Sequence, residues 1–395
     1  MSQLPSEILL EIFQWVLNPH ACIKPRHIPF QTLSVVSDQR DRIALKMGKN
    51  ISLVCRQWRQ LIAELLYRDI RILHGTKGLE EVLQTRTTNG NCYGDWVQRA
   101  VLPFSSTITG PSESSTCRAS IDILKLCPNL RILVRPQHLA SQELQFHYEA
   151  QSIPLPSLER LEWWHNNEAE RTGGINSLTA VLYAAPSLIY LFIGGLAGYT
   201  RIVSRPISLP NLKTLRLRSV DGLLLRQIVH SWALPALTQI VLDAPGLSPQ
   251  NLSMIWHKFG QQLRTVELGK NLRFLLNDAV SPCLRECPGL KEMNYFALFT
   301  LATELSSPHY SLQTVGLHCA VNSILAEPES AWSFLEHHFN MLLGQQLAVL
   351  QRIVLHGDWR GVVAHPRFEP ILQRSHRIGR FIVYPDGTTV SNQLH

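Results

Sequence analysis

A leucine motif that recurs nine times along the chain places the strongest constraint on its fold. Each copy reads Leu-x-x-Leu, with Ile, Val or Met also found at the last position. Successive first leucines lie 28, 30, 24, 25, 26, 27, 22 and 38 residues apart. Repeats of this length are typical of solenoids, in which each unit buries its apolar face against the next. The first leucines are Leu130, Leu158, Leu188, Leu212, Leu237, Leu263, Leu290, Leu312 and Leu350.

The stretches between these motifs have the patterns of helices. Ser177 precedes an apolar helix face that starts at Leu178, and Pro249 suits the first position of another helix. Residues 329–343 place four apolar side chains on one stripe. Six of the nine motif leucines have a proline two residues earlier, where proline ends a helix and begins extended backbone. We therefore expect an α/β solenoid over residues 95–395, with parallel strands and outer helices.

Residues that alternate with the motif leucines along each strand would point away from the core. In a solenoid these positions line the open, concave face that binds partners. Trp163 and Trp164 are adjacent, so only one of them can point into the core. Exposed aromatic and Arg side chains are typical of interface centres. The candidate target-binding residues are Arg160, Glu162, Trp164, Phe192, Arg216, Arg218, Asp243, Glu267, Phe296, His318 and His356.

Two apolar patterns near the N-terminus predict a helical head over residues 1–73. The first helix has Pro5 at its first position and ends at Leu17, and it is apolar on more than one face. Two apolar faces on a short helix suggest a small core on one side and a partner on the other. The second helix would follow Asn50 as its N-cap and carry Trp58 on its apolar face.

An insertion, residues 18–49, separates these two helices. It reads as a loop followed by a short helix through Met47. A short strand would leave the head at Tyr67–Ile72, and residues 74–94 would form a hinge before the solenoid.

The head residues resemble an F-box of the type found in fungal proteins. The match lies in Leu4-Pro5-x-Glu7-Ile8-Leu9-x-x-Ile12-Phe13 and in Leu53-Val54-Cys55-Arg56-x-Trp58-Arg59. The resemblance implies a three-helix module that binds the Skp adaptor of cullin–RING ubiquitin ligases. The nine motifs are similar to leucine-rich repeats, although the usual Asn or Cys position is lacking. The adaptor-binding residues implied by the resemblance are Leu4, Pro5, Ile8, Leu9, Ile12, Phe13, Leu53, Val54, Cys55 and Trp58.

The sequence offers no arrangement that is typical of catalysis or metal binding. Cys283 and Cys287 are the nearest approach to a metal pair, but no second Cys/His pair has zinc-site spacing. Cys55 would lie on an apolar helix face, where a thiol is inert. There is no phosphate-binding glycine loop and no nucleophile elbow. We expect a non-catalytic chain without cofactor or metal.

Charge and hydropathy limit the partners and the compartment. The net charge of +7 is spread along the chain without a block of five or six like charges, which argues against nucleic-acid binding. No apolar run approaches the ~20 residues of a membrane-spanning helix, and the N-terminus lacks the pattern of a signal peptide. The expected location is therefore cytoplasmic, nuclear or both, without a membrane partner.

These observations lead to one main functional expectation and two alternatives. The chain would be the substrate receptor of a Skp–cullin–F-box ubiquitin ligase, with the head on the adaptor and the repeats on a target protein. One alternative is a repeat scaffold without a ligase role, whose head is a helical hairpin that only packs on the repeats. The other is an enzyme on an irregular α/β fold, which would need a deep pocket with convergent polar groups.

Overall fold

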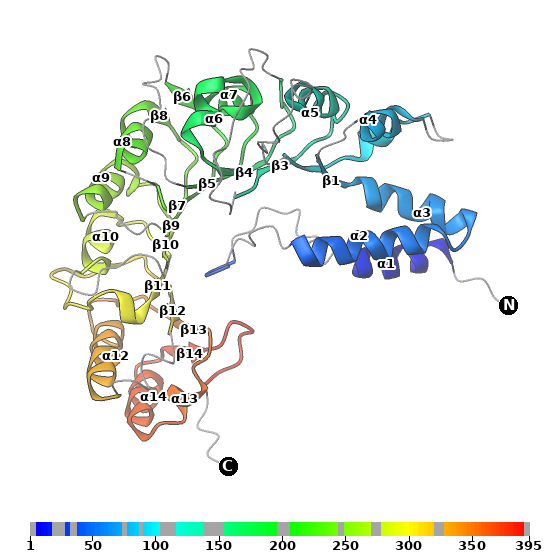
Figure 1. The fold of residues 1–395 in the computed structure, drawn as a ribbon. Helices are drawn as coiled ribbons and strands as arrows, with labels where there is room; N and C mark the ends of the chain where they lie inside the picture. Colours follow the sequence, from blue (N-terminus) through cyan, green and yellow to red (C-terminus); the bar gives the residue numbers. More distant parts are fainter. Residues whose placement is uncertain are drawn as a thin grey trace. The chain divides into compact units, whose positions relative to one another are not determined.

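A computed structural model of the chain shows two compact units (Figure 1). The first comprises Met1–Arg26 and Thr32–Leu212, and the second comprises His27–Gln31 and Lys213–His395. Among the described helices, none combines the length and the apolar character that a bilayer crossing needs. The residues described are 5–17, 28–31, 38–72, 77–86, 90–102, 116–137, 153–195, 206–220, 222–243, 249–269, 278–319 and 328–390.

Three helices begin the first unit: α1 (Ser6–Leu17), α2 (Asp38–Ser52) and α3 (Arg56–Tyr67). Leu9 and Phe13 of α1 pack with Ile62 of α3 in a small core of their own. This core is flanked by partly buried side chains, which are Leu17, Ile51, Trp58, Leu61, Leu65 and Leu66.

The expected N-cap at Asn50 is wrong. Helix α2 continues through Asn50 to Ser52. Ile51 packs against the core formed by Leu9, Phe13 and Ile62, and this contact stabilises the last turn of α2. Cys55 is the actual N-cap of α3, and its sulfur accepts a hydrogen bond from the Trp58 N–H at 3.4 Å. The apolar residues Leu53 and Val54 consequently lie in the turn between α2 and α3 instead of on a helix.

Five parallel strands of the first unit follow in the order β1-β2-β3-β4-β5. The hinge expected over 74–94 instead holds α4 and a 3-10 turn, and the α4 side chain of Leu83 is fully buried. The strand–helix alternation therefore begins at β1. The elements are β1 (Asp69–Arg71), α4 (Lys77–Gln84), η1 (Tyr93–Trp96), β2 (Arg99–Val101), α5 (Thr116–Lys125), β3 (Ile132–Arg135), β4 (Arg160–Trp164), α6 (Asn167–Thr172), η2 (Gly174–Asn176), α7 (Leu178–Ala184), β5 (Tyr190–Gly194) and β6 (Ile207–Ser208).

Seven further parallel strands form the sheet of the second unit, in the order β7-β9-β10-β11-β12-β13-β14. The longer helices cover one face of these strands (Figure 1). The elements are β7 (Thr214–Arg218), α8 (Gly222–Ser231), β8 (Trp232–Ala233), β9 (Gln239–Asp243), α9 (Pro249–Phe259), β10 (Thr265–Leu268), α10 (Val280–Glu286), β11 (Glu292–Phe296), η3 (Ala297–Phe299), β12 (Thr314–His318), α12 (Pro328–Leu342), β13 (Arg352–His356), α13 (Arg360–Val363), η4 (Pro366–Phe368), α14 (Glu369–Arg377) and β14 (Phe381–Val383).

The nine motif leucines set the positions of nine strands. Each strand from β3 to β5, β7 and from β9 to β13 begins two residues after its first motif leucine. All nine first leucines are at most 3% exposed. Of the adjacent tryptophans, Trp163 points into the core at 1% exposure and Trp164 is partly exposed. The expected α/β architecture with parallel strands is confirmed.

A buried arginine completes the end of α12. Arg380, which precedes β14, donates hydrogen bonds to the carbonyls of Leu342, Gly344 and Leu347. These carbonyls follow the last turn of α12, where backbone oxygens have no partner inside the helix. The guanidinium charge also complements the negative end of the helix dipole. The Leu347 carbonyl also accepts from the Leu350 N–H at 3.1 Å, so Arg380 matters most for the carbonyls of Leu342 and Gly344.

A second buried polar pair joins α12 to β11. His338 is fully buried, and its Nε2 donates to the Thr300 carbonyl at 2.9 Å, because a carbonyl can only accept. At Nδ1 the neutral ring then accepts a hydrogen bond from the Tyr295 hydroxyl, 3.2 Å away. Burial lowers the pKa of His338 from 6.5 to about 4 and raises the pKa of Tyr295. The fold therefore holds a neutral imidazole at position 338.

Replacing Arg380 with methionine should lower the free energy of unfolding by about 2 kcal/mol, because the buried Leu342 carbonyl and the partly buried Gly344 carbonyl would lose their donor. Urea denaturation followed by tryptophan fluorescence measures the change. Arg377→Met is the matched control, since Arg377 is exposed on α14 and should have an effect within about 0.5 kcal/mol. Equal effects of the two substitutions would contradict the proposed role of Arg380.

The buried imidazole should make stability depend on pH in a defined window. Above pH 6.5 both states carry neutral His338, so its contribution is complete. Between pH 6.5 and about 4, His338 binds a proton in the unfolded chain but stays neutral in the folded chain. The free energy of unfolding therefore falls as the pH is lowered through this range. The loss from this group is about 3 kcal/mol and ends below the folded pKa.

Denaturation curves across this pH range test the effect. His338→Gln should flatten the slope of unfolding free energy against pH, whereas His337→Gln, at the exposed neighbouring position, should retain it. An unchanged slope in His338→Gln would assign the pH dependence to other groups.

Candidate binding surfaces

Helix α1 presents two apolar stripes. Leu9 and Phe13 lie on the buried stripe, in the head core. Ile8, Ile12 and Trp15 follow at helical spacing on a second stripe and are 44%, 45% and 78% exposed. The structure therefore divides the apolar residues of α1 between the head core and an exposed surface. The sequence-based expectation that this helix is apolar on more than one face is confirmed.

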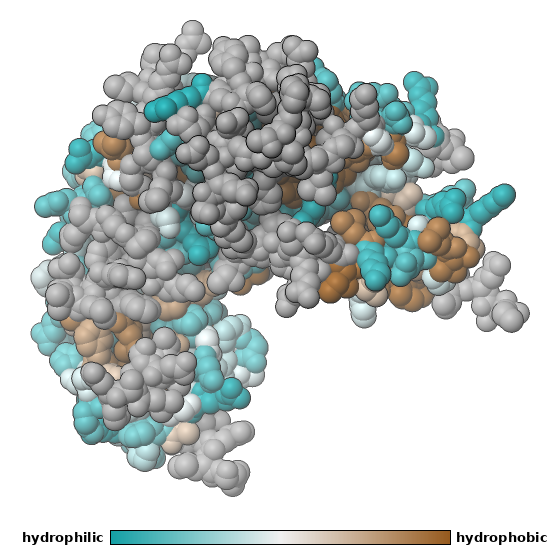
Figure 2. Space-filling view, viewed as in Figure 1, coloured by the Kyte–Doolittle hydropathy of each residue, from teal (hydrophilic) through white to brown (hydrophobic). Residues whose placement is uncertain are grey.

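The turn between α2 and α3 adds further exposed apolar side chains. Leu53 is 72% exposed and Val54 is 60% exposed. Cys55 is exposed as well, so the expectation that it lies on an inert apolar helix face is wrong. Figure 2 shows hydrophobic side chains gathered over the helices of the head. Exposed apolar residues at this density are typical of a protein-binding surface.

The implied adaptor-binding residues therefore separate into two groups. Pro5, Ile8, Ile12, Leu53, Val54 and Cys55 are exposed and available to a partner. Leu9 and Phe13 form the core, and Trp58 packs edge-on against Phe13 with ring centroids 5.1 Å apart. Leu4 lies outside the described residues.

The open face of the first unit carries two aromatic contacts. Trp164 meets Phe192 edge-on at 5.4 Å, and Phe192 is only 1% exposed. On the same two strands, the Arg160 guanidinium stacks on the Tyr190 ring at 4.3 Å and pairs with Glu162 at 2.6 Å. These side chains stabilise one another.

The open face of the second unit brings charged and aromatic residues together. Arg218 and Asp243 form an ion pair at 3.6 Å. Phe296 of β11, His318 of β12 and His356 of β13 are in register on neighbouring strands, and the rings of Phe296 and His318 lie 4.3 Å apart. We call these three side chains the aromatic box.

A short segment from the insertion covers this box. Ile28 to Gln31 form a turn in which the Gln31 N–H donates to the Ile28 carbonyl at 3.2 Å. The Phe30 ring lies 5.1 Å from Phe296, 5.2 Å from His318 and 4.9 Å from His356, measured between centroids.

The backbone of the turn is also bound. The Phe30 N–H donates to Glu267 at 2.9 Å, and Arg216 donates to the Gln31 carbonyl at 2.6 Å. Glu267 and Arg216 face outward from the sheet as expected, but beside the bound turn they are only 2% and 6% exposed.

The sequence placed the turn residues in a loop and gave no signal for their location. Phe30 is 237 residues from Glu267 along the chain, and no periodic pattern links them. Pro29 and a following aromatic residue indicate a turn, but a turn alone does not identify what it contacts.

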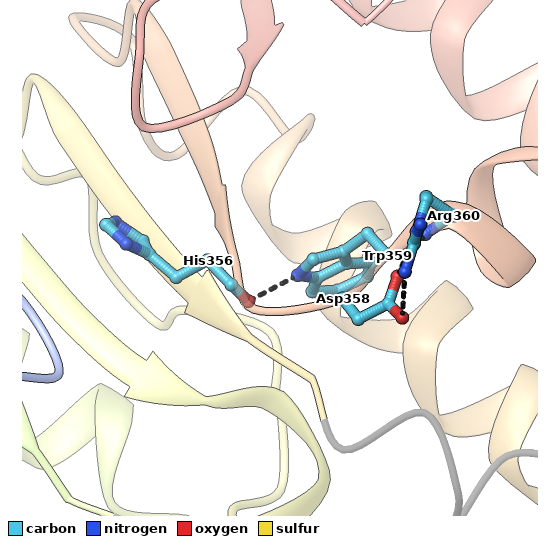
Figure 3. A network of polar contacts seen from close by, with 4 residues as sticks. All are labelled: His356, Asp358, Trp359 and Arg360. Atoms are coloured by element: carbon cyan, nitrogen blue, oxygen red, sulfur yellow. Dashed lines mark hydrogen bonds and ion pairs between the residues drawn. The ribbon is translucent and has the colours of Figure 1, made fainter.

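The end of β13 is fixed by local contacts that hold His356 in the box (Figure 3). The Trp359 indole N–H donates to the His356 carbonyl at 2.8 Å, and the His356 imidazole extends away from the indole. Asp358 and Arg360 pair beside them at 3.0 Å. Gly357 has a φ of +86°, and a Cβ there would lie 2.8 Å from the His318 ring. The glycine lets His318 pack against the backbone.

Cys283 and Cys287, which the sequence offered as the nearest approach to a metal pair, lie in the core of the second unit. Cys283 and Cys287 are fully buried, and burial raises the pKa of the Cys283 thiol. His337 is exposed and His338 is buried, as adjacent positions on a helix require. Among the described residues, no three His, Cys, Asp or Glu side chains are arranged to hold a metal ion.

Comparison with known proteins gives no family assignment. No protein-family model matches the chain, and a search of the curated proteins finds no match.

Proposed function

We propose that this chain is the non-catalytic substrate receptor of a Skp–cullin–F-box ubiquitin ligase. The head would be an F-box that binds a Skp-family adaptor, and the leucine-rich-repeat-like strands would bind the target protein. The receptor would act by proximity, since holding a target beside the ubiquitin carrier raises its effective concentration there.

The observation that carries the proposal is the exposed apolar surface of the head. The head helices already have a core in Leu9, Phe13 and Ile62, so Ile8 and Ile12 are not needed to build it. An apolar stripe that stays exposed beside a complete core supports a partner of its own.

A repeat scaffold without a ligase role is the alternative function. The aromatic and charged residues on the open faces of both units are compatible with this scaffold function, because they do not depend on an adaptor bound to the head. This alternative does not account for the exposed apolar stripe on α1. A measurement of adaptor binding distinguishes the two functions.

The full chain should bind a purified Skp-family adaptor in isothermal titration calorimetry. Ile8→Asp, Ile12→Asp and Leu53→Asp should each weaken binding at least tenfold, because a carboxylate would be desolvated in an apolar interface. Each variant should keep the circular dichroism spectrum of the parent chain, since all three side chains are exposed.

Gln14→Asp is the matched control for the same helix. Gln14 is exposed on a third face of α1, so the added charge should leave adaptor affinity within about twofold. Failure of the intact chain to bind the adaptor would leave the scaffold alternative. Equal losses of adaptor affinity in Gln14→Asp and Ile12→Asp would show that the exposed stripe is not the docking surface.

A further inference from the structure

We infer that the aromatic box of the second unit is a peptide-binding site for targets that present an aromatic side chain on a proline-led turn. The segment Ile28–Gln31 would be an intramolecular ligand that occupies the site until a target displaces it. That the ligand is a target protein rests on the proposed receptor function, whereas its chemistry rests on the contacts of Phe30 with the box.

The first support is the completeness of the recognition. Phe30 places one ring against three rings from neighbouring strands. Two side chains bind the backbone beside that ring. Glu267 accepts from the Phe30 N–H, and Arg216 donates to the Gln31 carbonyl. An aromatic anchor flanked by two charge-assisted backbone hydrogen bonds is how peptide sites combine specificity with affinity.

The second support is the backbone of Phe30. Pro29 at the second turn position and a φ of 58° at Phe30 are the signature of a type II turn, whose third position favours glycine. A phenylalanine there is strained, and such strain persists only where surrounding contacts hold it. The contacts of the Phe30 ring with the aromatic box therefore offset the strain in its backbone.

The third support is that the bound segment does not use the whole site. Ile28 is 49% exposed and Gln31 is exposed. Within the described residues, the buried Nε of Arg216 has no hydrogen-bond partner. A longer or better-matched peptide could engage this donor, so a target could compete with the tethered segment.

A synthetic peptide of residues 24–35 serves as the probe, labelled for fluorescence anisotropy and titrated with the full chain. Phe30→Ala in the chain should empty the box and bind the peptide at least tenfold more tightly than the parent chain. The factor follows from a tether that supplies a ~1 mM effective concentration against a peptide dissociation constant of ~0.1 mM.

Two controls test the site and the aromatic requirement. Adding Phe296→Ala to the Phe30→Ala chain should abolish peptide binding, and a peptide with Phe30→Ala should not bind either chain. Phe30→Leu in the chain keeps an apolar side chain and should give an intermediate affinity.

Three outcomes would overturn the inference. One is peptide affinity in Phe30→Ala equal to that of the parent chain, and another is equal affinity for the two peptides. The third is loss of folding by both Phe30→Ala and Phe30→Leu, which would make the segment a structural part of the unit. The assay contains no adaptor, so its failure leaves adaptor binding untouched, and failed adaptor binding leaves peptide binding untouched.

Discussion

Burial of the leucine that precedes each of nine strands, β3 to β5, β7 and β9 to β13, is the interaction on which the repeats depend. Because this leucine lies two residues before the strand, it fixes both where the strand starts and which face it turns inward. Leu212 and Leu237 show the relation, since β7 and β9 begin at Thr214 and Gln239 and pair in register. Irregular spacing between motifs is tolerated, because the additional residues are accommodated outside the strands.

The same constraint leaves one face of each sheet free for other chemistry. In β7 the inward Leu215 and Leu217 are 1% exposed, and the outward Arg216 lies between them. Polar side chains at such positions do not contribute to the repeat core. In the second unit they bind a segment that comes from far away in the sequence.

The periodic part of the structure could be predicted from sequence, and the nonperiodic part could not. The motif leucines gave the strands, and Ser177 and Pro249 marked the helices α7 and α9 that the structure contains. The start of α3 was missed because a core contact of Ile51 extended α2 past a favourable N-cap, an override of local propensity by packing. The sequence predicted a second apolar face on α1, but apolar composition alone did not decide which residues form the core and which remain exposed.

The docking of Phe30 had no local signal, because it depends on contacts across 237 residues. The backbone conformation of Phe30 nevertheless sets a lower limit on the free energy that its contacts contribute. A left-handed φ costs a nonglycine residue about 1 kcal/mol, and glycine at this turn position would remove that cost. Glycine would also leave Phe296, His318 and His356 without the ring they surround. The left-handed backbone at Phe30 therefore indicates that the ring contacts outweigh the backbone strain. A box with such a preference should accept an aromatic side chain whichever chain supplies it.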